Sequence, residues 1–422
     1  MMQNKLSYDV AVIGGGPAGL AAAAAASKAG VKRVAVIERD ARIGGILLQC
    51  IHPGFGLNYF HEELTGPEYA ERFRALAIEQ KVDFLTDTTV LSIGEKQLTV
   101  INPRQGISTI EVGAIVLAMG CRERTRGAIR IPGTRPAGIY TAGAAQRLVN
   151  RQNLMIGHKV VILGSGDIGM IMARRMTLQG TEVKAVIELL PYLTGLLRNK
   201  IQCLDDFGIP LMLSHTISEI IGKDRVEAVR VVKLDNQRQI IPGSEQHIEC
   251  DTLLLSVGLI PENELSRSCG IEMDEVTNGP VVNQYMQTSV PFIFACGNVV
   301  HVNDLVDNVS RESETAGCNA ARYTLGTLPV NSKTVRCQSG TGIRYVVPQQ
   351  LVLDGSEDEI TLNFRVTAPG GTTKLSAVQS ADELTTRKVR RVSPGEMEHL
   401  TVKASTLSGG APLQINSAEV ME

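Results

Sequence analysis

Two glycine-rich turns of one kind stand in this sequence, and each has the residue types needed to hold the pyrophosphate of a dinucleotide. The first reads DVAVIGGGPAGL and the second VVILGSGDIGM, each directly after an apolar run. In such a turn the first glycine permits a tight strand-to-helix reversal, the second lets a phosphate approach the backbone, and the third lets helix and strand pack closely. The helix that follows presents unpaired N–H groups and a positive dipole end to the phosphates. The glycines concerned are Gly14, Gly16, Gly19, Gly164, Gly166 and Gly169.

An acidic residue stands at the same distance from each turn. Glu38 lies 24 positions beyond Gly14 (38 − 14), and Glu188 lies 24 positions beyond Gly164 (188 − 164). A carboxylate there accepts hydrogen bonds from ribose hydroxyls and repels a 2′-phosphate, so Glu188 favours NADH over NADPH. A single glycine pattern also occurs in βαβ units without a ligand, whereas two complete patterns predict two dinucleotide sites. A chain with two such sites is most simply an electron-transfer flavoprotein.

The elements that position these turns are expected to form two βαβ units. A strand over 9–13, a helix over 17–29 and a strand over 34–38 make the first, and the second begins at Lys159 and continues to about Cys250. Short strands are also expected, over 82–85, 89–93 and 97–101.

Local signals predict further elements. Thr65, with Glu68 three residues on, is a capping box that opens a helix over 67–80. The runs AIVLAMG and VPFIFACGN are expected to be strands, and a helix is expected over 310–324. The segment 121–157 is rich in Arg, Gly and Pro, which predicts a connection between domains.

The pattern of apolar and polar residues changes after Leu328. Apolar residues then alternate with polar ones, among many Ser, Thr and Gly, and helical periodicity ends. The alternating positions are Ile360, Leu362, Phe364 and Val366. This pattern predicts a separate all-β domain from about Val330 to Glu422.

Composition limits the kinds of partner and compartment. The chain has 422 residues, 43% apolar and 20% charged, with a formal net charge of −2, so nothing points to nucleic acid or an anionic membrane. No apolar stretch is long enough to span a membrane, and no secretion signal is expected before the first strand, which predicts a cytoplasmic protein. The eight cysteines include no C-x-x-C pair and no Cys/His cluster, so no metal site is expected.

The order of these pieces resembles the two-dinucleotide-domain flavoproteins, the family that includes the pyridine nucleotide–disulfide oxidoreductases, over about residues 7–325. The resemblance implies an α/β fold with two Rossmann-like FAD and NAD(P) domains in a glutathione-reductase-like arrangement, plus the C-terminal all-β domain. The FAD-binding domain would comprise 1–122 and 253–329, interrupted by an NAD(P)H-binding domain at 123–252 and followed by a β-sandwich-like domain at 330–422.

The resemblance also implies particular cofactor contacts. The segment ACGN matches one that normally ends in Gly-Asp and contacts the ribityl chain of the flavin; Asn298 stands here instead, which keeps hydrogen bonding but loses the charge. The expected FAD contacts are Gly14, Gly16, Pro17, Ala18, Gly19, Glu38, Arg39, Gly44, Gly45, Ile46, Val90, Ala118, Met119, Gly120, Gly297 and Asn298. The expected NAD contacts are Gly164, Ser165, Gly166, Asp167, Ile168, Gly169, Glu188 and Gly258.

A narrower resemblance lies in GGILLQCIHPGFG, GCRERTRGAIRIPGTRPAG, RYVVPQ and SPGEM. These segments are similar to a bacterial subgroup of FAD/NAD(P)-dependent oxidoreductases related to flavoprotein subunits of amine-oxidising and cyanide-forming dehydrogenases. The subgroup implies an oligomer and a second flavoprotein that resembles glycerol-3-phosphate dehydrogenase.

Few catalytic side chains are expected, because hydride transfer needs mainly stacking of the two rings and exclusion of water. Ile46 and its apolar neighbours stand where disulfide reductases carry their first cysteine, so no dithiol relay is available. Cys50 could cycle through a sulfenate, with His52 lowering its pKa or donating a proton, or it could simply pack in the loop.

Two further groups of polar residues leave alternatives open. Arg122, Arg124, Arg126 and Arg130 could grip a phosphate or an anionic substrate, or form a solvated connection with scattered ion pairs. His301 and Asp304 could relay a proton or only line the site near the flavin.

The sequence thus favours an FAD-dependent oxidoreductase that takes hydride from NAD(P)H, with NADH preferred. Its electrons would go to oxygen, a small acceptor or a partner dehydrogenase flavoprotein. The alternative is a non-catalytic or FAD-only assembly subunit of a dehydrogenase complex. The intact second turn with Glu188 favours the enzyme, since a scaffold needs no NADH pocket.

Overall fold

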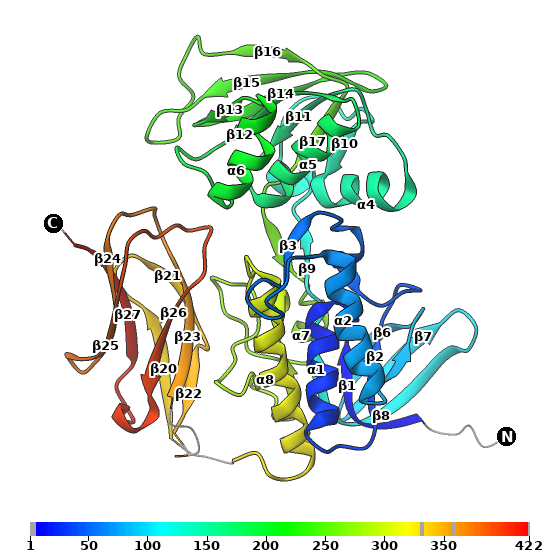
Figure 1. Ribbon diagram of the computed structural model, residues 1–422, viewed down its shortest axis with the longest axis vertical. Helices are drawn as coiled ribbons and strands as arrows, with labels where there is room; N and C mark the ends of the chain where they lie inside the picture. Colours follow the sequence, from blue (N-terminus) through cyan, green and yellow to red (C-terminus); the bar gives the residue numbers. More distant parts are fainter. Residues whose placement is uncertain (1–5, 330–332, 354, 356–358, 421–422) are drawn as a thin grey trace. The chain divides into compact units, whose positions relative to one another are not determined.

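The computed structural model describes residues 6–329, 333–353, 355 and 359–420. The chain divides into two compact units, Met1–Cys121 with Pro261–Glu422, and Arg122–Ile260 (Figure 1). Short strands β9 (Cys121–Glu123) and β18 (Leu259–Pro261) include the two points where the chain passes from one unit to the other. The expected domain boundary at Val330 and the end at Glu422 lie outside the described residues.

The larger unit contains a sheet with strand order β5-β2-β1-β8-β7-β6, and β19 pairs with β8. Five of these strands run parallel, so their carboxyl ends meet at one edge: β5 (Asp83–Leu85), β2 (Val34–Ile37), β1 (Leu6–Ile13), β8 (Gly106–Leu117) and β19 (Ile293–Ala295). The antiparallel strands are β6 (Thr89–Gly94) and β7 (Gln97–Asn102). All four residues of β2 are buried, as expected for a strand covered on both faces.

Two helices pack against this sheet, and a third packs against the first of them. α1 (Pro17–Lys28) and α8 (Val306–Thr324) pack side by side, and a Cβ placed on Gly317 would lie 2.0 Å from the Ala22 carbonyl oxygen (Figure 1). Only small residues allow two helix backbones to approach so closely, which the alanine run of α1 provides. α2 (Gly66–Glu79) begins at the predicted capping box, where the Thr65 N–H donates to Glu68 Oε2 at 2.8 Å.

The remaining elements of this part are short. They are the 3-10 turns η1 (Gly45–Gln49) and η3 (Gly297–Val299), the strands β3 (Pro53–Phe55) and β4 (Leu64–Thr65), and the helix α7 (Glu264–Ser268).

The C-terminal region is all β, as the alternation predicted. It has two sheets, one of order β22-β20-β27-β24-β25 and one of order β21-β23-β26, and they share a hydrophobic core. In β23 the four alternating residues Ile360, Leu362, Phe364 and Val366 are all buried. The strands are β20 (Thr334–Ser339), β21 (Ile343–Val347), β22 (Gln350–Val352), β23 (Glu359–Val366), β24 (Thr373–Gln379), β25 (Asp382–Val389), β26 (Glu398–Lys403) and β27 (Leu413–Glu419), with a 3-10 turn η4 (Ala404–Thr406).

The smaller unit is a second Rossmann-like fold. Its parallel sheet has the order β10-β17-β11-β12-β13, and an antiparallel sheet β14-β15-β16 accompanies it. The strands are β10 (Ile139–Thr141), β11 (Lys159–Leu163), β12 (Glu182–Glu188), β13 (Leu211–Leu213), β14 (His215–Gly222), β15 (Val226–Lys233), β16 (Gln246–Glu249) and β17 (Thr252–Leu255). The helical elements are α3 (Arg126–Ile129), α4 (Ala142–Gln152), α5 (Asp167–Leu178), α6 (Leu197–Cys203) and η2 (Asp205–Phe207).

The expectation that segment 121–157 is only a connection was wrong in part. It contains β10, which pairs with β17, and the eleven-residue helix α4. The Thr141 side chain caps this helix by accepting a hydrogen bond from the Ala144 N–H at 3.4 Å. The buried face of the helix includes Ala142, Ala145 and Val149. The abundant Arg, Gly and Pro around these elements concealed them in the sequence.

Among the described residues, no helix has the length and apolar character needed to cross a bilayer.

Two candidate dinucleotide sites

The first glycine turn joins β1 to α1 at the carboxyl edge of the larger sheet. Gly14 has φ +108°, and a Cβ there would lie 2.4 Å from the Ala118 carbonyl oxygen, so both conformation and space require glycine. A Cβ on Gly19 would lie 1.8 Å from the Gly14 carbonyl oxygen. A Cβ on Gly16, in contrast, would meet nothing nearer than Gly45 Cα at 4.0 Å. The open space therefore lies over the second glycine, at the N-terminus of α1.

Glu38 follows β2 and is buried, with 8% of its surface exposed. Its Oε2 accepts the Gly15 N–H at 2.8 Å and its Oε1 accepts the Asp40 N–H at 2.8 Å. These two bonds fix the carboxylate, and each oxygen keeps a lone pair for a ribose hydroxyl. The Thr88 N–H donates to the Glu38 carbonyl at 2.9 Å, which brings the start of β6, and with it the half-buried Val90, to this side of the site.

A second glycine pair lies against the turn. Gly44 N–H donates to the Gly15 carbonyl at 2.8 Å, and a Cβ on Gly45 would lie 2.8 Å from Gly16 Cα. The two segments thus touch backbone to backbone, with Ile46 exposed beside them. Arg39, at the other end of the site, is exposed.

Two strand ends complete this edge. The Ala118 N–H, just after β8, donates to the Ile13 carbonyl at 2.9 Å, and the Cys296 N–H, just after β19, donates to the Leu117 carbonyl at 3.0 Å. A Cβ on Gly297 would lie 3.0 Å from Ala18 Cβ. The structure therefore brings the predicted segments 14–19, 118–120 and 297–298 together, as ligand sites of parallel sheets require.

The second turn joins β11 to α5 in the smaller unit. A Cβ on Gly164 (φ +101°) would lie 2.0 Å from the Ser256 carbonyl oxygen, and a Cβ on Gly166 would have only the Ser256 hydroxyl within 3.2 Å. At the first helical position, Asp167 Oδ1 accepts the Leu196 N–H at 2.8 Å and Asn199 Nδ2 at 2.7 Å.

The other expected contacts of the second turn lie on both sides of it. Ile168 follows Asp167 in α5 and is half-buried against the core of this unit. Gly258 follows β17 and accepts the Arg124 N–H at 3.0 Å.

Glu188, at the end of β12, is held by side chains as well as by the backbone. Its Oε2 accepts the Ser165 N–H at 2.8 Å, the Ser165 hydroxyl at 2.6 Å and the Thr194 hydroxyl at 3.2 Å. Its Oε1 accepts the Leu190 N–H at 2.9 Å. Glu188 is 4% exposed. Oε2 already has three donors, whereas Oε1 has one and can accept a further hydrogen bond.

Cys50 and His52 lie in the loop after η1. The Cys50 thiol donates to the Ile46 carbonyl at 3.4 Å, and burial raises the pKa of this thiol to about 12. His52 Nδ1 lies 3.0 Å from the Pro53 carbonyl oxygen. Because burial keeps the pKa of the thiol far above neutral pH, a packing role for Cys50 is favoured over a redox role.

Arg126 is committed to the backbone of its own segment. Its guanidinium donates to the carbonyl oxygens of Ile131, Gly133 and Thr134 at 2.5–3.3 Å. Burial, and then Arg135, lower the pKa of Arg126. Arg130 ends α3 in the left-handed conformation with φ 54°. For Arg126 the geometry thus favours the structural alternative over phosphate binding.

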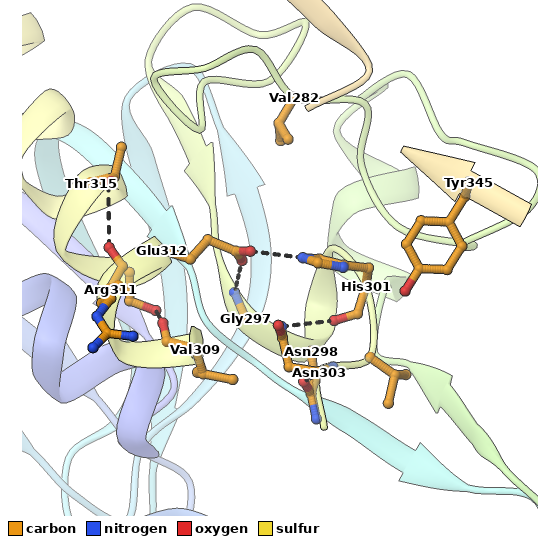
Figure 2. Close-up of polar contacts among 12 residues, drawn as sticks. Val282, Gly297, Asn298, His301, Asn303, Val309, Arg311, Glu312, Thr315 and Tyr345 are labelled. Atoms are coloured by element: carbon orange, nitrogen blue, oxygen red, sulfur yellow. Dashed lines mark hydrogen bonds and ion pairs between the residues drawn. The ribbon is translucent and has the colours of Figure 1, made fainter. Parts of the chain in front are cut away.

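One buried polar group near Gly297 was missed by sequence reasoning. Glu312, in the middle of α8, accepts the Gly297 N–H at 2.6 Å and lies 2.7 Å from His301 Nε2 (Figure 2). Asn298 turns its Oδ1 toward the Asn303 N–H at 2.9 Å. No local sequence signal links positions 297, 301 and 312, because only the packing of α8 against β19 brings them together.

Two glycine turns, each at the start of a helix and each with a buried carboxylate after the next strand, define a flavoprotein with two dinucleotide folds. The model of the pyridine nucleotide-disulphide oxidoreductase family matches residues 8–320, and the chain belongs to this family. The FAD and NAD(P)H expected from the sequence are the cofactors of this family.

Individual relatives are distant. Hydrogen cyanide synthase subunit HcnB of Pseudomonas protegens is 26% identical over 70% of this chain and 66% of its own length. An opine oxidase subunit of Agrobacterium tumefaciens is 27% identical over 69% of this chain and 61% of its own length. The chain thus spans less than two thirds of each of these relatives. The T. acidophilum thioredoxin reductase structure shares the fold, with a TM-score of 0.62 and 22% identity over 76% of this chain and all of that one.

Proposed function

We propose that this chain transfers hydride from NADH to FAD and that the reduced flavin then passes electrons directly to oxygen, a small acceptor or a partner dehydrogenase flavoprotein. The observation that carries the proposal is the presence of two complete turns with buried carboxylates in one chain. When bound, FAD supplies the two-electron chemistry. The protein supplies binding, orientation and exclusion of water.

The proposed FAD site is the carboxyl edge of the larger sheet. The open space over Gly16 would receive the pyrophosphate, and Glu38 would bind the adenosine ribose. The cofactor would then extend toward its ring along three backbone segments, Gly44–Gly45, Ala118–Gly120 and Gly297–Asn298. The proposed NADH site is the second turn, where the buried charge of Glu188 disfavours a 2′-phosphate.

The proposed electron exit avoids thiol chemistry. Cys50 has no second cysteine within a disulfide-reductase spacing, and its raised pKa keeps it protonated near neutral pH. Two relatives bear the names of enzyme subunits, and this supports a partner protein here also. We propose that the partner is a flavoprotein resembling glycerol-3-phosphate dehydrogenase and that it docks partly on the β-domain after Val330.

Domain limits and location are part of the same proposal. The FAD domain would comprise 1–122 and 253–329, the NAD(P)H domain 123–252 and the β-domain 330–422. We propose a cytoplasmic location, because eight scattered cysteines without a C-x-x-C pair suit a reducing compartment.

The test is anaerobic reduction of the purified yellow protein. NADH should bleach the flavin absorbance, and NADPH at the same concentration should do so more slowly. Admission of oxygen, a quinone or a co-purified partner should restore the colour and identify the acceptor. A flavoprotein that stays yellow with both nucleotides would instead be an assembly subunit or an FAD-only dehydrogenase.

A further inference from the structure

A buried carboxylate holds the backbone turn that follows β19. Glu312 Oε1 accepts the Gly297 N–H at 2.6 Å, and Oε2 lies 2.7 Å from His301 Nε2. The side chains of His301 and Glu312 are 1% and 7% exposed. An ionised carboxylate this deep is tolerated only where donors compensate for lost hydration, and here one backbone N–H and one imidazole N–H do so.

The other side of the imidazole indicates its protonation. His301 Nδ1 is buried and has no hydrogen-bond partner among the described atoms. A doubly protonated ring would bury an unpaired N–H there, whereas a ring protonated only at Nε2 leaves just a lone pair. The geometry therefore fits a neutral His301 that donates to an ionised Glu312, so that the pair carries one negative charge.

The bond to Gly297 fixes the direction of a peptide group. Because N–H and C=O point opposite ways in a trans peptide, Glu312 sets the orientation of the Cys296–Gly297 peptide as a whole. Gly297 itself has φ +70° and lies against Ala18 and Val309. The turn is thus held from α8 on one side and contacts the first residues of α1 on the other.

The β-domain holds the segment that carries His301. The Tyr345 ring, from β21, stands edge-on to the His301 ring with centroids 5.9 Å apart (Figure 2). Arg365 in β23 donates to the Val302 carbonyl at 3.0 Å and to the Tyr345 hydroxyl at 3.2 Å, and lies 3.8 Å from Asp304 Oδ1. The Met397 N–H donates to Asp304 Oδ2 at 3.2 Å. These contacts keep His301 in place against Glu312.

We propose that Glu312 and His301 are positioning residues for the flavin. Together they fix the Gly297–Asn298 turn and add a buried negative charge at the cofactor edge, where Asn298 contributes none. The β-domain, through Tyr345 and Arg365, completes the arrangement. This inference rests on the proposed FAD site at that edge.

Substitutions can separate geometry from charge. Glu312→Gln keeps the shape and an acceptor for Gly297 but removes the charge, and Glu312→Leu removes both. We expect Glu312→Leu to weaken FAD binding to the apoprotein about tenfold or more, the equivalent of one lost charge-assisted hydrogen bond. Glu312→Gln should bind FAD within about threefold of wild type. Its flavin midpoint potential should shift positive, because removal of a nearby negative charge favours the electron-rich reduced state.

The imidazole has a matching pair of variants. His301→Gln keeps a donor toward Glu312 and should restore most of the FAD affinity that His301→Leu loses. A double variant His301→Leu/Glu312→Leu should lose less affinity than the two single losses added together, because the residues act as one unit. Glu314→Gln is the control, since Glu314 is also on α8 but binds the Tyr59 hydroxyl. It should leave both affinity and potential unchanged.

The measurements are FAD titration of apoprotein and potentiometry of the holoprotein. The inference would be overturned if both Glu312 variants had the FAD affinity and flavin midpoint potential of the wild type. It would also be overturned if Glu314→Gln changed these two quantities as much as the Glu312 variants do. If Glu312→Leu fails to fold, the positioning role is tested by the flavin midpoint potential of Glu312→Gln and by the FAD affinity of His301→Gln. A wild-type protein that takes up no FAD would overturn the proposed function as well, whereas normal uptake with indifferent variants overturns the positioning role alone.

Discussion

The two glycine turns have the same backbone plan and hold their carboxylates differently. Among the residues that the structure describes, the donors to the Glu38 carboxylate are the backbone N–H groups of Gly15 and Asp40. Glu188 also accepts the hydroxyls of Ser165 and Thr194. The first turn has Gly15 where the second has Ser165, and a Cβ on Gly15 would require Ile43 Cδ1, 2.8 Å away, to move.

This difference affects how rigidly each carboxylate is held before a ligand binds. Backbone donors around Glu38 cannot rotate away, so its geometry is set before a ligand arrives. Hydroxyl donors around Glu188 can rotate, and a ribose hydroxyl can replace them and later be replaced by them. We infer that the first turn suits a resident cofactor and the second a dinucleotide that binds and leaves in each turnover.

The largest expected effect comes from closing the first turn. Gly16→Val should weaken FAD binding at least about a hundredfold and give colourless protein, because the side chain fills the open space over the helix N-terminus. Flavin content per protein, read from absorbance, measures the loss. Gly166→Val is the matched control and should keep FAD but lose reduction by NADH. Full flavin occupancy in Gly16→Val would refute the assignment of the two turns.

The next effect concerns the choice of nucleotide. Glu188→Arg should change the ratio of NADH to NADPH efficiency by about tenfold to a hundredfold in favour of NADPH, because a cation replaces the charge that repels the 2′-phosphate. Stopped-flow rates of flavin reduction with each nucleotide give the ratio. Unchanged flavin content shows that the first site is intact. A wild-type protein that NADPH reduces faster would contradict this role for Glu188.

A smaller effect tests the idea of exchange itself. Ser165→Ala removes one hydroxyl from Glu188 and leaves its Oε2 freer for a ribose hydroxyl. The KM for NADH should fall about threefold, the size of one neutral hydrogen bond, while FAD affinity stays constant. Thr194→Val, which removes the longer 3.2 Å bond, should act in the same direction but less. A rise in KM for both variants would show that the hydroxyls belong to the bound state instead.

The smallest effect is expected at Cys50. Cys50→Ser should keep reduction by NADH and most acceptor turnover, because burial raises the pKa of the thiol to about 12 and leaves it protonated below that. Activity between pH 6 and 9 should therefore show no change that depends on this residue. Turnover with oxygen and with a quinone, compared across that range, provides the test. NADH-dependent disulfide reduction that disappears in Cys50→Ser would overturn the direct route of electron exit.

Local signals predicted the parts of the fold that local interactions determine. The turns at Gly14 and Gly164, the capping box at Thr65 and the alternation through β23 each depend on neighbours a few residues apart. α4 was missed because its alanines lie within a segment of helix-breaking composition. α8 ends at Thr324 as predicted but begins at Val306, four residues before the predicted start at 310.

The candidate sites were predictable to the same extent. The glycines and acidic residues recur at fixed spacing, so their roles could be proposed without coordinates. The bonds of Ser165 and Thr194 to Glu188, and of Glu312 to Gly297, join residues from different elements. Such contacts depend on how helices cross the sheet and leave no periodic trace in the sequence.

The backbone contact between α1 and α8 has a consequence for how this protein can change. Ala22 and Gly317 meet with no space for a side chain, so neither helix can slide on the other without a collision. α1 starts at the first glycine turn, and α8 carries Glu312, which accepts the Gly297 N–H, so the contact between the two helices helps to fix the distance between these two turns. Gly317 lies about 16 Å along α8 from the first residue of the helix. A methyl group there would push the two helices apart and change the distance between the two turns. A position far from the proposed cofactor site therefore limits how that site can change its shape.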